Sequence, residues 1–416
     1  MANISEKLTS QLPQGLVDLL REIGETALAR GENSYLVGGV VRDAILKRPN
    51  HDLDVVIEGK AISLAQQLAE TKDWKIRKHP RFGTAKLSWE DFSLDLVTAR
   101  LETYSRPGAL PTVERGTIGD DLARRDFTIN AMSVHLNPDS FGELLDPHGG
   151  QNDLQHKLVR ILHPGSFSDD PTRILRALRY EQRLGFRLEQ ETERLIRNHP
   201  GKLNTVTGER LWRELEMILQ EEYPEKTLKR ADELGVLQQL HPAVKGDEWL
   251  AEKFDQARDL DDKSLSLPSI YLSLLCYRLS NEETESCITR LKMPGWAARA
   301  LRDTIRIKQS ISHLDKADIH PSDIYLNLQC HAPETVMSTA TASDSPVIQE
   351  RLEIYLKKLR YVKPVLSGED LQNMGIIKGK RVGQVLWALH AARLDKKISN
   401  LEEEKTLARE LLHTTT

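Results

Sequence analysis

The sequence predicts an α+β protein, with a strand-containing N-terminal part followed by a long, all-helical remainder. Two observations lead to this prediction. Before about residue 135, short apolar segments with the two-residue period of strands alternate with helical segments, and beyond Asp153 the apolar residues follow helical spacing. The chain has 416 residues, more than one compact core normally holds, so we expect several structural units.

The N-terminal part reads in order as helix, strand, helix, strand, helix and two further strands. Leucines at helical spacing predict a helix over 14–30, and residues 35–37 form a short apolar strand that ends at Gly38-Gly39. A helix over 40–46, an alternating strand over 52–57 and a helix over 61–71 follow. Strands near 84–87 and 94–98 then complete a unit of about 110 residues with a small sheet.

The C-terminal two thirds show helical periodicity almost throughout. The clearest helices are predicted over 171–184, 190–197, 208–220 and 223–234. Prolines interrupt the pattern further on and mark the junctions between helices. These prolines are Pro242, Pro268, Pro294, Pro321 and Pro364.

The composition excludes several classes of protein. The sequence has no apolar run long enough for a membrane span and no basic segment followed by an apolar stretch, so we expect neither a membrane segment nor a secretory signal. The three cysteines (Cys276, Cys287 and Cys330) form no CxxC pair, which favours a reducing, cytoplasmic location. A net charge of −4 argues against coating of nucleic acid by bulk electrostatics but allows a local basic face.

Two aspartates lie two residues apart in the predicted strand over 52–57. Residues i and i+2 of a strand point to the same face, so Asp52 and Asp54 project side by side. Two carboxylates on one face can hold hard divalent cations, most plausibly Mg²⁺, and paired ions of this kind catalyse phosphoryl transfer. Asp95, in the middle of a later strand, is the candidate for a third catalytic carboxylate.

A lone DxD is more often a pair of solvated carboxylates, and here the preceding segment YLVGGVVRD strengthens the functional interpretation. Gly38 and Gly39 let the backbone approach a triphosphate at a helix N-terminus, and Arg42 supplies a guanidinium suited to phosphate. The segment is neither a P-loop nor a dinucleotide-binding GxGxxG. His51-Asp52 could belong to a metal phosphohydrolase, but no second histidine set accompanies it.

Arginines gather on one face of the predicted helix over 171–184. Arg173, Arg176, Arg179 and Arg183 fall within a third of its circumference, opposite Ile174, Leu175 and Leu178. Like charges at this spacing repel, which favours a helix that faces a triphosphate or RNA over a merely solvated basic face. Upstream, Arg124-Arg125-Asp126 precedes an apolar stretch, and alone it could be an ordinary helix start.

Together these segments resemble the motifs of class II tRNA nucleotidyltransferases, the bacterial and eukaryotic CCA-adding enzymes and their relatives in the DNA polymerase β superfamily. The motifs are GGVVRD, DLD, RRDFTINAM, DPHGGQNDL, DDPTRILRALR and GERLWREL, and the resemblance is dense from Tyr35 to about Leu215. It implies a nucleotidyltransferase head with a small mixed β-sheet, followed by an all-α neck, body and tail. We expect the head over 1–139, the neck over 140–235, the body over 236–355 and the tail over 356–416.

The resemblance also implies roles for individual residues. Asp52 and Asp54 would hold the metal, and Arg125, Asp126 and Asn130 would belong to the ribose-recognition motif. Asp170 and Arg173 would hydrogen-bond the Watson–Crick edge of the incoming base, with Arg176 and Arg179 on the same helix. Glu209, Arg210 and Glu214 would brace that helix. The family usually has Glu where this chain has Asp169.

The segment DLQNMGIIKGKRVGQVLWALHAARLDKKI resembles the C-terminal tail of these enzymes. Gly375, Gly379 and Gly383 recur every four residues, which is consistent with close backbone approach to tRNA or, equally, with helix packing or turn chemistry. Where family members often carry a proline after the second glycine, this chain has Lys380.

The predicted activity is addition of nucleotides from CTP and ATP to the 3′ end of tRNA, with Mg²⁺ as cofactor and no protein partner implied. The interval LETYSRPGALPTVERGTIGDDLA looks full-length, which disfavours CC-only addition and leaves complete CCA addition and A-only addition open. A poly(A) polymerase is a further relative, but its basic C-terminal extension is not seen. The alternative from another class is a non-catalytic RNA-binding protein on the same fold.

Overall fold

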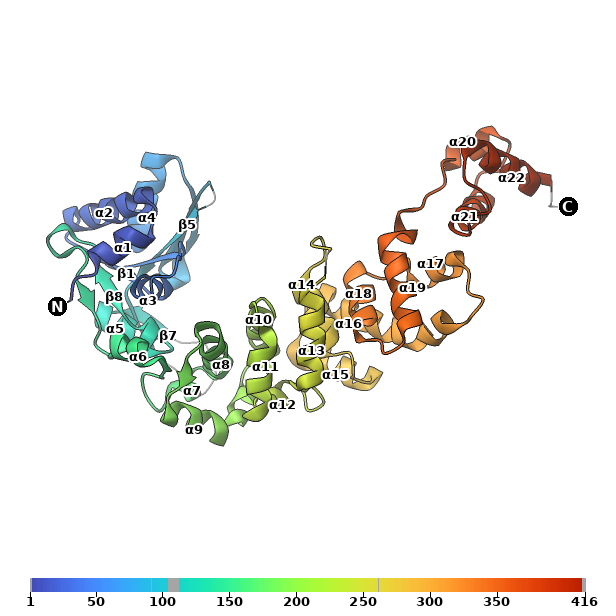
Figure 1. The fold of residues 1–416 in the computed structure, drawn as a ribbon. Coiled ribbons are helices and arrows are strands. Elements are labelled where there is room, and N and C mark those ends of the chain that lie inside the picture. Colours follow the sequence, from blue (N-terminus) through green and yellow to red (C-terminus); the bar gives the residue numbers. More distant parts are fainter. Residues whose placement is uncertain (1, 91, 104–111, 261, 414–416) are drawn as a thin grey trace. The chain divides into compact units, whose positions relative to one another are not determined.

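The computed structural model describes residues 2–90, 92–103, 112–260 and 262–413, coloured along the chain in Figure 1. The chain divides into two compact units. The first comprises Met1–Glu214 with Glu233–Gln239, and the second comprises Leu215–Asp232 with Leu240–Thr416. The predicted α+β class is confirmed, since the β-sheet lies near the N-terminus and helices make up most of the rest. The expected division into head, neck, body and tail stays a prediction.

Within the described residues, seven strands of the first unit form one mixed sheet in the order β3-β4-β5-β2-β1-β8-β9. Strands β2 and β5 are parallel, and every other neighbouring pair is antiparallel. The strands are β1 (Asn33–Val37), β2 (Leu53–Glu58), β3 (Lys75–His79), β4 (Thr84–Trp89), β5 (Phe92–Thr98), β8 (Ser133–His135) and β9 (Leu144–Leu145). The mixed sheet expected for the head is therefore present.

The two faces of the central strands differ in character. On one face, the register aligns Leu53 with Leu94 and Val55 with Leu96, and all four side chains are fully buried. Helix α4 (Ala61–Lys72) packs against β4 and β5, and its Leu64 is also fully buried. The opposite face carries the polar residues of the site, because alternate strand residues point to opposite sides.

Helices and a hairpin complete the strand-containing part. They are α1 (Ser5–Gln11), α2 (Gln14–Ala29), α3 (Gly39–Ile45), α5 (Ile118–Ala123) and the hairpin of β6 (Arg100–Thr103) with β7 (Thr112–Arg115). The predicted helices over 14–30, 40–46 and 61–71 agree with α2, α3 and α4 within two residues. Strand β3 was not predicted because its sequence, KIRKH, lacks apolar alternation; it is a charged edge strand with mostly exposed side chains.

Helices follow from residue 150 onward, interrupted in the described residues only by two short strands, β10 (Leu158–Val159) and β11 (Arg187–Leu188). In the first unit they are α6 (Gly150–His156), α7 (Ser166–Asp169), α8 (Arg173–Leu184) and α9 (Gln190–Asn198), and α10 (Gly208–Leu219) begins there. Helix α8 ends at Gly185, whose φ of 67° is a left-handed conformation that suits glycine at a helix end.

The second unit is helical in its described part. Helices α11 (Pro224–Glu233) and α12 (Leu237–Leu240) cross the boundary between the units. The other helices of the second unit are α13 (Glu248–Arg258), α14 (Leu267–Leu275), α15 (Asn281–Leu291), α16 (Gly295–Ser310), α17 (Pro321–Leu328), α18 (Pro333–Ala342), α19 (Pro346–Lys357), α20 (Gly368–Asn373), α21 (Lys380–Leu394) and α22 (Leu401–His413). Helix α18 packs against α14, α16 and α19. No helix of the described residues is both long and apolar enough to cross a membrane.

The last three helices have a small core of their own. It consists of Leu366, Leu371, Ile376, Val385, Leu389 and Ala408. Beside it, the fully buried carboxylate of Glu404 accepts hydrogen bonds from the backbone N–H groups of Val365 and Leu366 and pairs with Arg393. These bonds fix the segment that leads into α20 against α22.

Candidate active site

Polar residues form a row across the open face of the sheet. The register places Val37 of β1 opposite Asp54 of β2, Asp54 opposite Asp95 of β5, and Asp95 opposite Lys86 of β4. Residues paired in this way share a face. The two predicted catalytic carboxylates Asp54 and Asp95 are therefore neighbours, and Lys86 Nζ lies 3.4 Å from Asp95 Oδ2.

Asp52 lies immediately before β2 and is exposed, and its backbone N–H donates to Asn50 Oδ1 at 2.9 Å. Burial raises the pKa of Asp54 to about 6, and the charge of Asp52 adds to this rise. Arg125 opposes the rise in the pKa, Asp95 adds to it, and Lys86 opposes it. The carboxylates thus repel one another, which is the electrostatic situation that a bound cation relieves.

The described residues include no group of three or more His, Cys, Asp or Glu side chains gathered closely enough to hold a metal ion. The donor set nevertheless suits a hard divalent cation, because Asp52, Asp54 and Asp95 offer only carboxylate oxygens. Asp52 and Asp54 are the residues that would hold the ion.

Gly38 joins β1 to α3 beside the carboxylates. Its φ of 78° and ψ of −140° suit glycine alone, and a Cβ here would lie 3.1 Å from Arg125 Nη1 and 3.5 Å from Asp54 Oδ2. Gly39 is the first residue of α3 and has an ordinary φ. Gly38 therefore brings the backbone close to Arg125 and Asp54, and approach of a triphosphate to the glycine pair stays a prediction.

Arg42, predicted to bind the triphosphate, is buried and turned into the protein. Its Nε and Nη2 donate to the two carboxylate oxygens of Asp43 at 2.8 Å, and its Nη1 donates to Asn130 Oδ1 at 2.7 Å. Burial disfavours the charge, but the bonds to Asp43 raise the pKa of the Arg42 guanidinium above its usual value. Its position indicates a role in holding α3, and triphosphate binding by Arg42 stays a prediction.

Asp126 connects the sheet to α8. Its Oδ1 accepts from the Phe127 N–H at 2.9 Å and from Asn130 Nδ2 at 3.0 Å, while its Oδ2 accepts from Arg176 Nε at 3.0 Å and Nη2 at 2.6 Å. Burial would raise the pKa of Asp126, but Arg176 and Asn130 hold it at about 2. Both oxygens are engaged, so contact with a ribose hydroxyl would require one of these bonds to be shared or exchanged.

Asp170 and Arg173, the predicted base-recognition pair, lie at the start of α8. Asp170 Oδ1 accepts from the Thr172 N–H at 3.0 Å and from Thr172 Oγ1 at 2.7 Å, and Arg210 Nη2 lies 2.7 Å from the same oxygen. The buried Arg173 donates to Ser166 Oγ and to the Arg124 carbonyl oxygen, each at 2.6 Å. These contacts orient both side chains before any ligand binds.

The arginine face of α8 is solvated only near its C-terminal end, where Arg183 is exposed. Arg176 pairs with Asp126 at 2.6 Å and lies 3.6 Å from Glu214, and Arg179, itself buried, lies 3.7 Å from Glu214. The arginines stabilise the charge of the buried Glu214, although burial raises its pKa overall. Internal carboxylates thus supply the neutralisation that the sequence analysis assigned to a triphosphate or RNA. The reason is that α8 is buried on both faces, which a helical projection does not show.

Bracing of α8 by Glu209, Arg210 and Glu214 stays a prediction, and two of these residues contact α8 or the residue before it. Arg210 contacts Asp170, and Glu214 pairs with Arg176 and Arg179, whereas Glu209 is exposed. Both contacts run from α10 to the start and middle of α8.

A cavity of about 390 Å³, here called the reaction cavity, brings most of these residues together. Its lining consists of Val37, Asp54, Val56, Thr84, Val97, Arg100, Glu102, Arg124, Arg125, Asp126, Asp170, Arg173 and Arg176. The cavity therefore brings together Asp54, the predicted ribose-recognition residues Arg125 and Asp126, and the predicted base-recognition pair Asp170 and Arg173. Six further residues lie behind or beside this lining and support it. They are Gly38, Gly39, Arg42, Asn130, Arg179 and Glu214.

Three charged residues of the site were not predicted. Asp121, buried in α5, pairs with Arg124 at 2.6 Å and with Arg125 at 3.0 Å, and Glu102 of β6 also pairs with Arg124 and with Arg100. The spacing GDDLARR puts Asp121 three and four residues before the arginines, which is a usable helix signal. The hairpin residues Arg100 and Glu102 had no comparable pattern.

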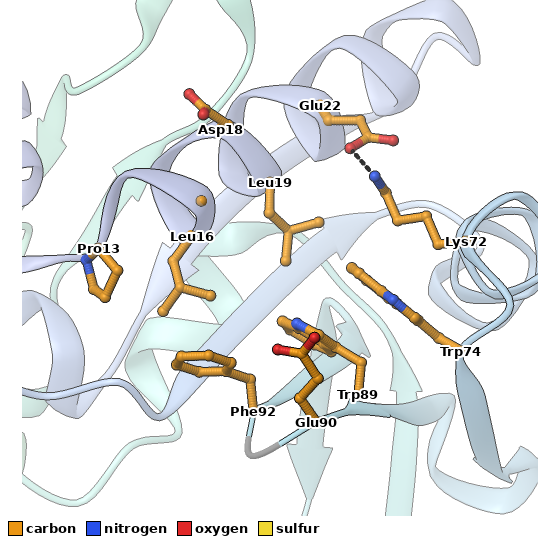
Figure 2. Close-up of a pocket in the computed structure, with 11 residues that line it drawn as sticks. Pro13, Leu16, Asp18, Leu19, Glu22, Lys72, Trp74, Trp89, Glu90 and Phe92 are labelled. Atoms are coloured by element: carbon orange, nitrogen blue, oxygen red, sulfur yellow. Dashed lines mark ion pairs between the residues drawn. The ribbon is translucent and has the colours of Figure 1, made fainter.

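A separate cavity of about 300 Å³ lies between α2 and the edge of the sheet (Figure 2). Leu16 and Leu19 point toward Trp89 and Phe92, and the rings of Trp74 and Trp89 stack with centroids 4.1 Å apart. The cavity shares no residue with the reaction cavity. Its apolar and aromatic residues indicate packing of α2 against the sheet, and Asp18, Glu22, Lys72 and Glu90 also line it.

The three tail glycines differ in their local conformations. Gly375 and Gly379 have φ values of 98° and 129°, and Gly383 lies inside α21. A Cβ at any of the three positions would meet no described atom within 4 Å. Turn chemistry therefore explains Gly375 and Gly379, tight helix packing explains none of the three, and their contact with tRNA stays a prediction.

The fold and the reaction cavity together define a nucleotidyltransferase-type head attached to helices, and comparison with known proteins agrees. Residues 34–160 match the family model "Poly A polymerase head domain", and residues 185–247 match "Probable RNA and SrmB- binding site of polymerase A". An A-adding tRNA nucleotidyltransferase of Halalkalibacterium halodurans is 32% identical over 99% of this chain and 96% of that protein. One of Geobacter sulfurreducens is 34% identical over 96% of this chain.

Solved structures give the same result over the whole chain. The apo form II of a CCA-adding enzyme has a TM-score of 0.81 and 31% identity, covering 100% of this chain and 99% of that one. The Thermotoga maritima CCA-adding enzyme in complex with tRNA has a TM-score of 0.76 and 31% identity, covering 99% and 98%. The chain belongs to the class II tRNA nucleotidyltransferase family. It spans about half the length of the Geobacter relative.

Proposed function

We propose that this protein adds nucleotides to the 3′ end of tRNA without a nucleic-acid template. The observation that carries the proposal is the reaction cavity, whose lining Asp54 shares with Asp126, Asp170 and Arg173. The known proteins that resemble the chain over most of its length are A-adding and CCA-adding enzymes. The reaction joins the 3′ oxygen of the tRNA to the α-phosphorus of ATP or CTP and breaks the bond to pyrophosphate.

Family membership implies dependence on a divalent metal, and we propose Mg²⁺, held by Asp52 and Asp54 with Asp95 beside them. When bound, this ion supplies stabilisation of the negative charge on the attacking and leaving oxygens. Arg125, whose Nη2 is held by Asp121 at 3.0 Å, lies beside Gly38 and can contact phosphate oxygens. Gly38 and Gly39 leave room for the triphosphate at the start of α3.

Base selection falls to Asp170 and Arg173. Thr172 and Arg210 contact Oδ1 of Asp170, and the carboxylate can accept a further hydrogen bond from the exocyclic amine of adenine or cytosine. Arg173 uses two of its five N–H groups on Ser166 and Arg124 among the described residues and can donate others to ring acceptors of the base. A carboxylate acceptor beside a guanidinium donor matches A and C and rejects U and G.

Addition of the terminal A is common to A-adding and CCA-adding enzymes and is the minimal form of the proposal. Three A-adding enzymes match the chain over 87–99% of its length, whereas the proteins named "Multifunctional CCA protein" match over 50–58%. This difference favours A-only addition as a specific second candidate. The solved CCA-adding enzymes, which match almost the whole chain, support complete CCA addition.

Primer extension tests the proposal. Two tRNA transcripts, one lacking the whole CCA and one lacking only the final A, are each incubated with CTP, ATP and Mg²⁺. Extension of both to full length identifies a CCA-adding enzyme, and extension of the second alone identifies an A-adding enzyme. The Asp52→Ala/Asp54→Ala variant should bind tRNA without extending it. If the unaltered protein binds tRNA but extends neither transcript, it is a binding protein on this fold.

A further inference from the structure

A second cavity in the strand-containing part lies beside the reaction cavity and is strongly basic. It measures about 410 Å³ and opens between the start of α4, the turn from β3 to β4 and the hairpin of β6 and β7. We call it the basic cavity and define it by Lys60, Arg81, Phe82, Arg100 and Arg115. Glu114 is the one acidic residue among its described lining residues.

Three of the four basic residues that define the basic cavity have no ion-pair partner among the described residues, and the fourth, Arg100, pairs with Glu102. In the described part of the chain, Lys60, Arg81 and Arg115 form no ion pair with any carboxylate. Arg124, Arg125 and Arg176 of the reaction cavity each pair with an acidic side chain. Unpaired cations that share one cavity repel each other, and an anionic ligand would remove this repulsion.

An exposed aromatic ring lies among these cations. Phe82 ends the 3₁₀ turn Pro80–Phe82 and is 40% exposed, and the guanidinium carbon of Arg81 lies 5.6 Å from its ring centroid. Arginines that contact phosphates, next to an aromatic ring on which a base can stack, are the combination that binds single-stranded nucleic acid. A solvated charged surface needs the arginines but gives no reason for the exposed ring.

The basic cavity borders the reaction cavity at Arg100. Arg100 lines both, and neighbouring residues of the same strands divide between them: Thr84 and Val97 line the reaction cavity, and Gly83 and Thr98 line the basic one. Arg100 Nη2 pairs with Glu102 at 2.8 Å, and its buried Nε has no partner among the described residues. A buried N–H without a partner is costly, and a phosphate oxygen at the junction would satisfy it.

We propose that the basic cavity binds the single-stranded 3′ end of the RNA acceptor. Arg81 and Arg115 contact its phosphates, and Phe82 stacks on one base. Arg100, which lines both cavities, binds a phosphate oxygen where the RNA leads toward the reaction cavity. This inference rests on the proposed function, because only a nucleotidyltransferase needs an RNA 3′ end beside its reaction cavity. The cavity is an RNA subsite rather than a nucleotide subsite, because the base-recognition pair Asp170 and Arg173 lines the other cavity.

The test compares two variants with a matched control. In Arg81→Ala/Arg115→Ala, KM for CC-ended tRNA should rise by about 10- to 100-fold, and the salt dependence of tRNA binding should weaken by about two phosphate contacts. In Phe82→Ala, KM for tRNA should rise by about 5- to 50-fold through lost stacking. KM for ATP should change by less than about twofold in both, because the nucleotide lies in the reaction cavity.

The control is Lys7→Ala/Arg21→Ala. It removes the same positive charge from exposed positions of α1 and α2, including an arginine whose guanidinium lies 4.5 Å from the ring of Phe141. It should leave KM for tRNA unchanged. Thermal unfolding checks that each variant folds, and a tRNA without its single-stranded 3′ residues should bind the unaltered protein and the Arg81/Arg115 variant equally.

The outcomes separate the two proposals. If the unaltered protein extends no tRNA, the proposed function fails. If it extends tRNA but the cavity variants match the control, the RNA subsite is absent. A rise in KM for ATP alone would assign the basic cavity to the nucleotide, and this would also overturn the inference.

Discussion

Gly38 shows how a missing side chain shapes the site. Its backbone has a conformation open to glycine alone, and the space of its absent Cβ lies against Arg125 and Asp54. Gly39 next to it has an ordinary φ, and the nearest atoms to a Cβ there are side-chain nitrogens at 3.5 Å. The two glycines therefore have separable roles. Gly38 is needed for its backbone conformation, and the role of Gly39 can be tested only with a bound ligand.

We expect Gly38→Ala to lower the free energy of unfolding by about 1–3 kcal/mol, through backbone strain, and to abolish nucleotide addition by displacing Arg125 and Asp54. Gly39→Ala should change the free energy of unfolding by less than about 1 kcal/mol. Urea unfolding measures both. Loss of ATP binding in a stable Gly39→Ala protein would support close approach of the triphosphate to this backbone, and equal destabilisation by the two changes would contradict the separation of roles.

Asp126 makes the stability of the protein depend on pH. Its pKa is about 2 in the folded protein, below the usual value of 3.8, because Arg176 and Asn130 stabilise the charged form despite burial. A group whose pKa is lowered on folding contributes stability above its unfolded pKa. That contribution is lost as the pH falls through the folded pKa, here between about pH 4 and pH 2.

In Asp126→Asn we therefore expect a free energy of unfolding about 2 kcal/mol lower than that of the unaltered protein at neutral pH. This difference should shrink as the pH falls from about 4 toward 2, because the unaltered protein then loses the same contribution. Denaturant unfolding at a series of pH values measures it. A difference that stays constant down to pH 2 would show that the ion pair with Arg176 is not its source.

Helices α8 and α10 together hold Asp170 and Arg173, the proposed base-recognition residues. Arg210 near the start of α10 contacts Asp170 Oδ1 at 2.7 Å, and Glu214 one turn later pairs with two arginines of α8. Arg210 and Thr172 both contact Oδ1 and so hold the Asp170 carboxylate in place. If Asp170 selects the base, as we propose, the selectivity of the site depends on this contact between two helices.

We expect Arg210→Ala to lower kcat/KM for ATP by about tenfold and to weaken the preference for ATP over GTP, because a charge-assisted bond to Asp170 is lost. Arg213→Ala is the matched control, since Arg213 is exposed on the same helix. Arg210→Lys should restore part of the preference. A purely structural role would lower the unfolding temperature without changing the ratio of ATP to GTP use.

At the scale of the whole molecule, the chemistry and the C-terminal helical core lie in different compact units. The reaction cavity belongs entirely to the first unit, and the core around Leu371 and Leu389 belongs to the second. Each unit has buried residues of its own, so a defect in the C-terminal core can leave nucleotide binding intact. We expect this core to contribute to tRNA binding, as the resemblance of its glycine segment to the family tail implies.

Glu404→Ala tests this separation. Removing a fully buried carboxylate that binds two backbone N–H groups and Arg393 should destabilise the C-terminal core by about 3 kcal/mol. Hydrogen exchange should accelerate in α20–α22 only, and KM should rise for tRNA but not for ATP. Glu402→Ala is the control, because that side chain is 77% exposed. Loss of ATP binding in Glu404→Ala would contradict the independence of the two units.

Much of the fold follows from local patterns. The predicted helices and central strands agree with the structure. In these segments apolar residues repeat clearly every second residue, as in a strand, or every 3.6 residues, as in a helix. The charged edge strand β3 and the hairpin of β6 and β7 lacked such signals. Pairing with β4 stabilises β3, and sequence spacing does not record that partner.

The sequence by itself determined the α+β class, the family and the residues that gather at the site, because these depend on spacing within short segments. Only the tertiary structure decided which charges are neutralised internally. Arg42 and Arg179 are paired with Asp43 and Glu214, while Arg81 and Arg115 have no ion-pair partner in the described chain. The physical reason is that the pKa and the ligand of a charged group depend on neighbours within a few ångströms, and residues far apart in sequence supply most of those neighbours.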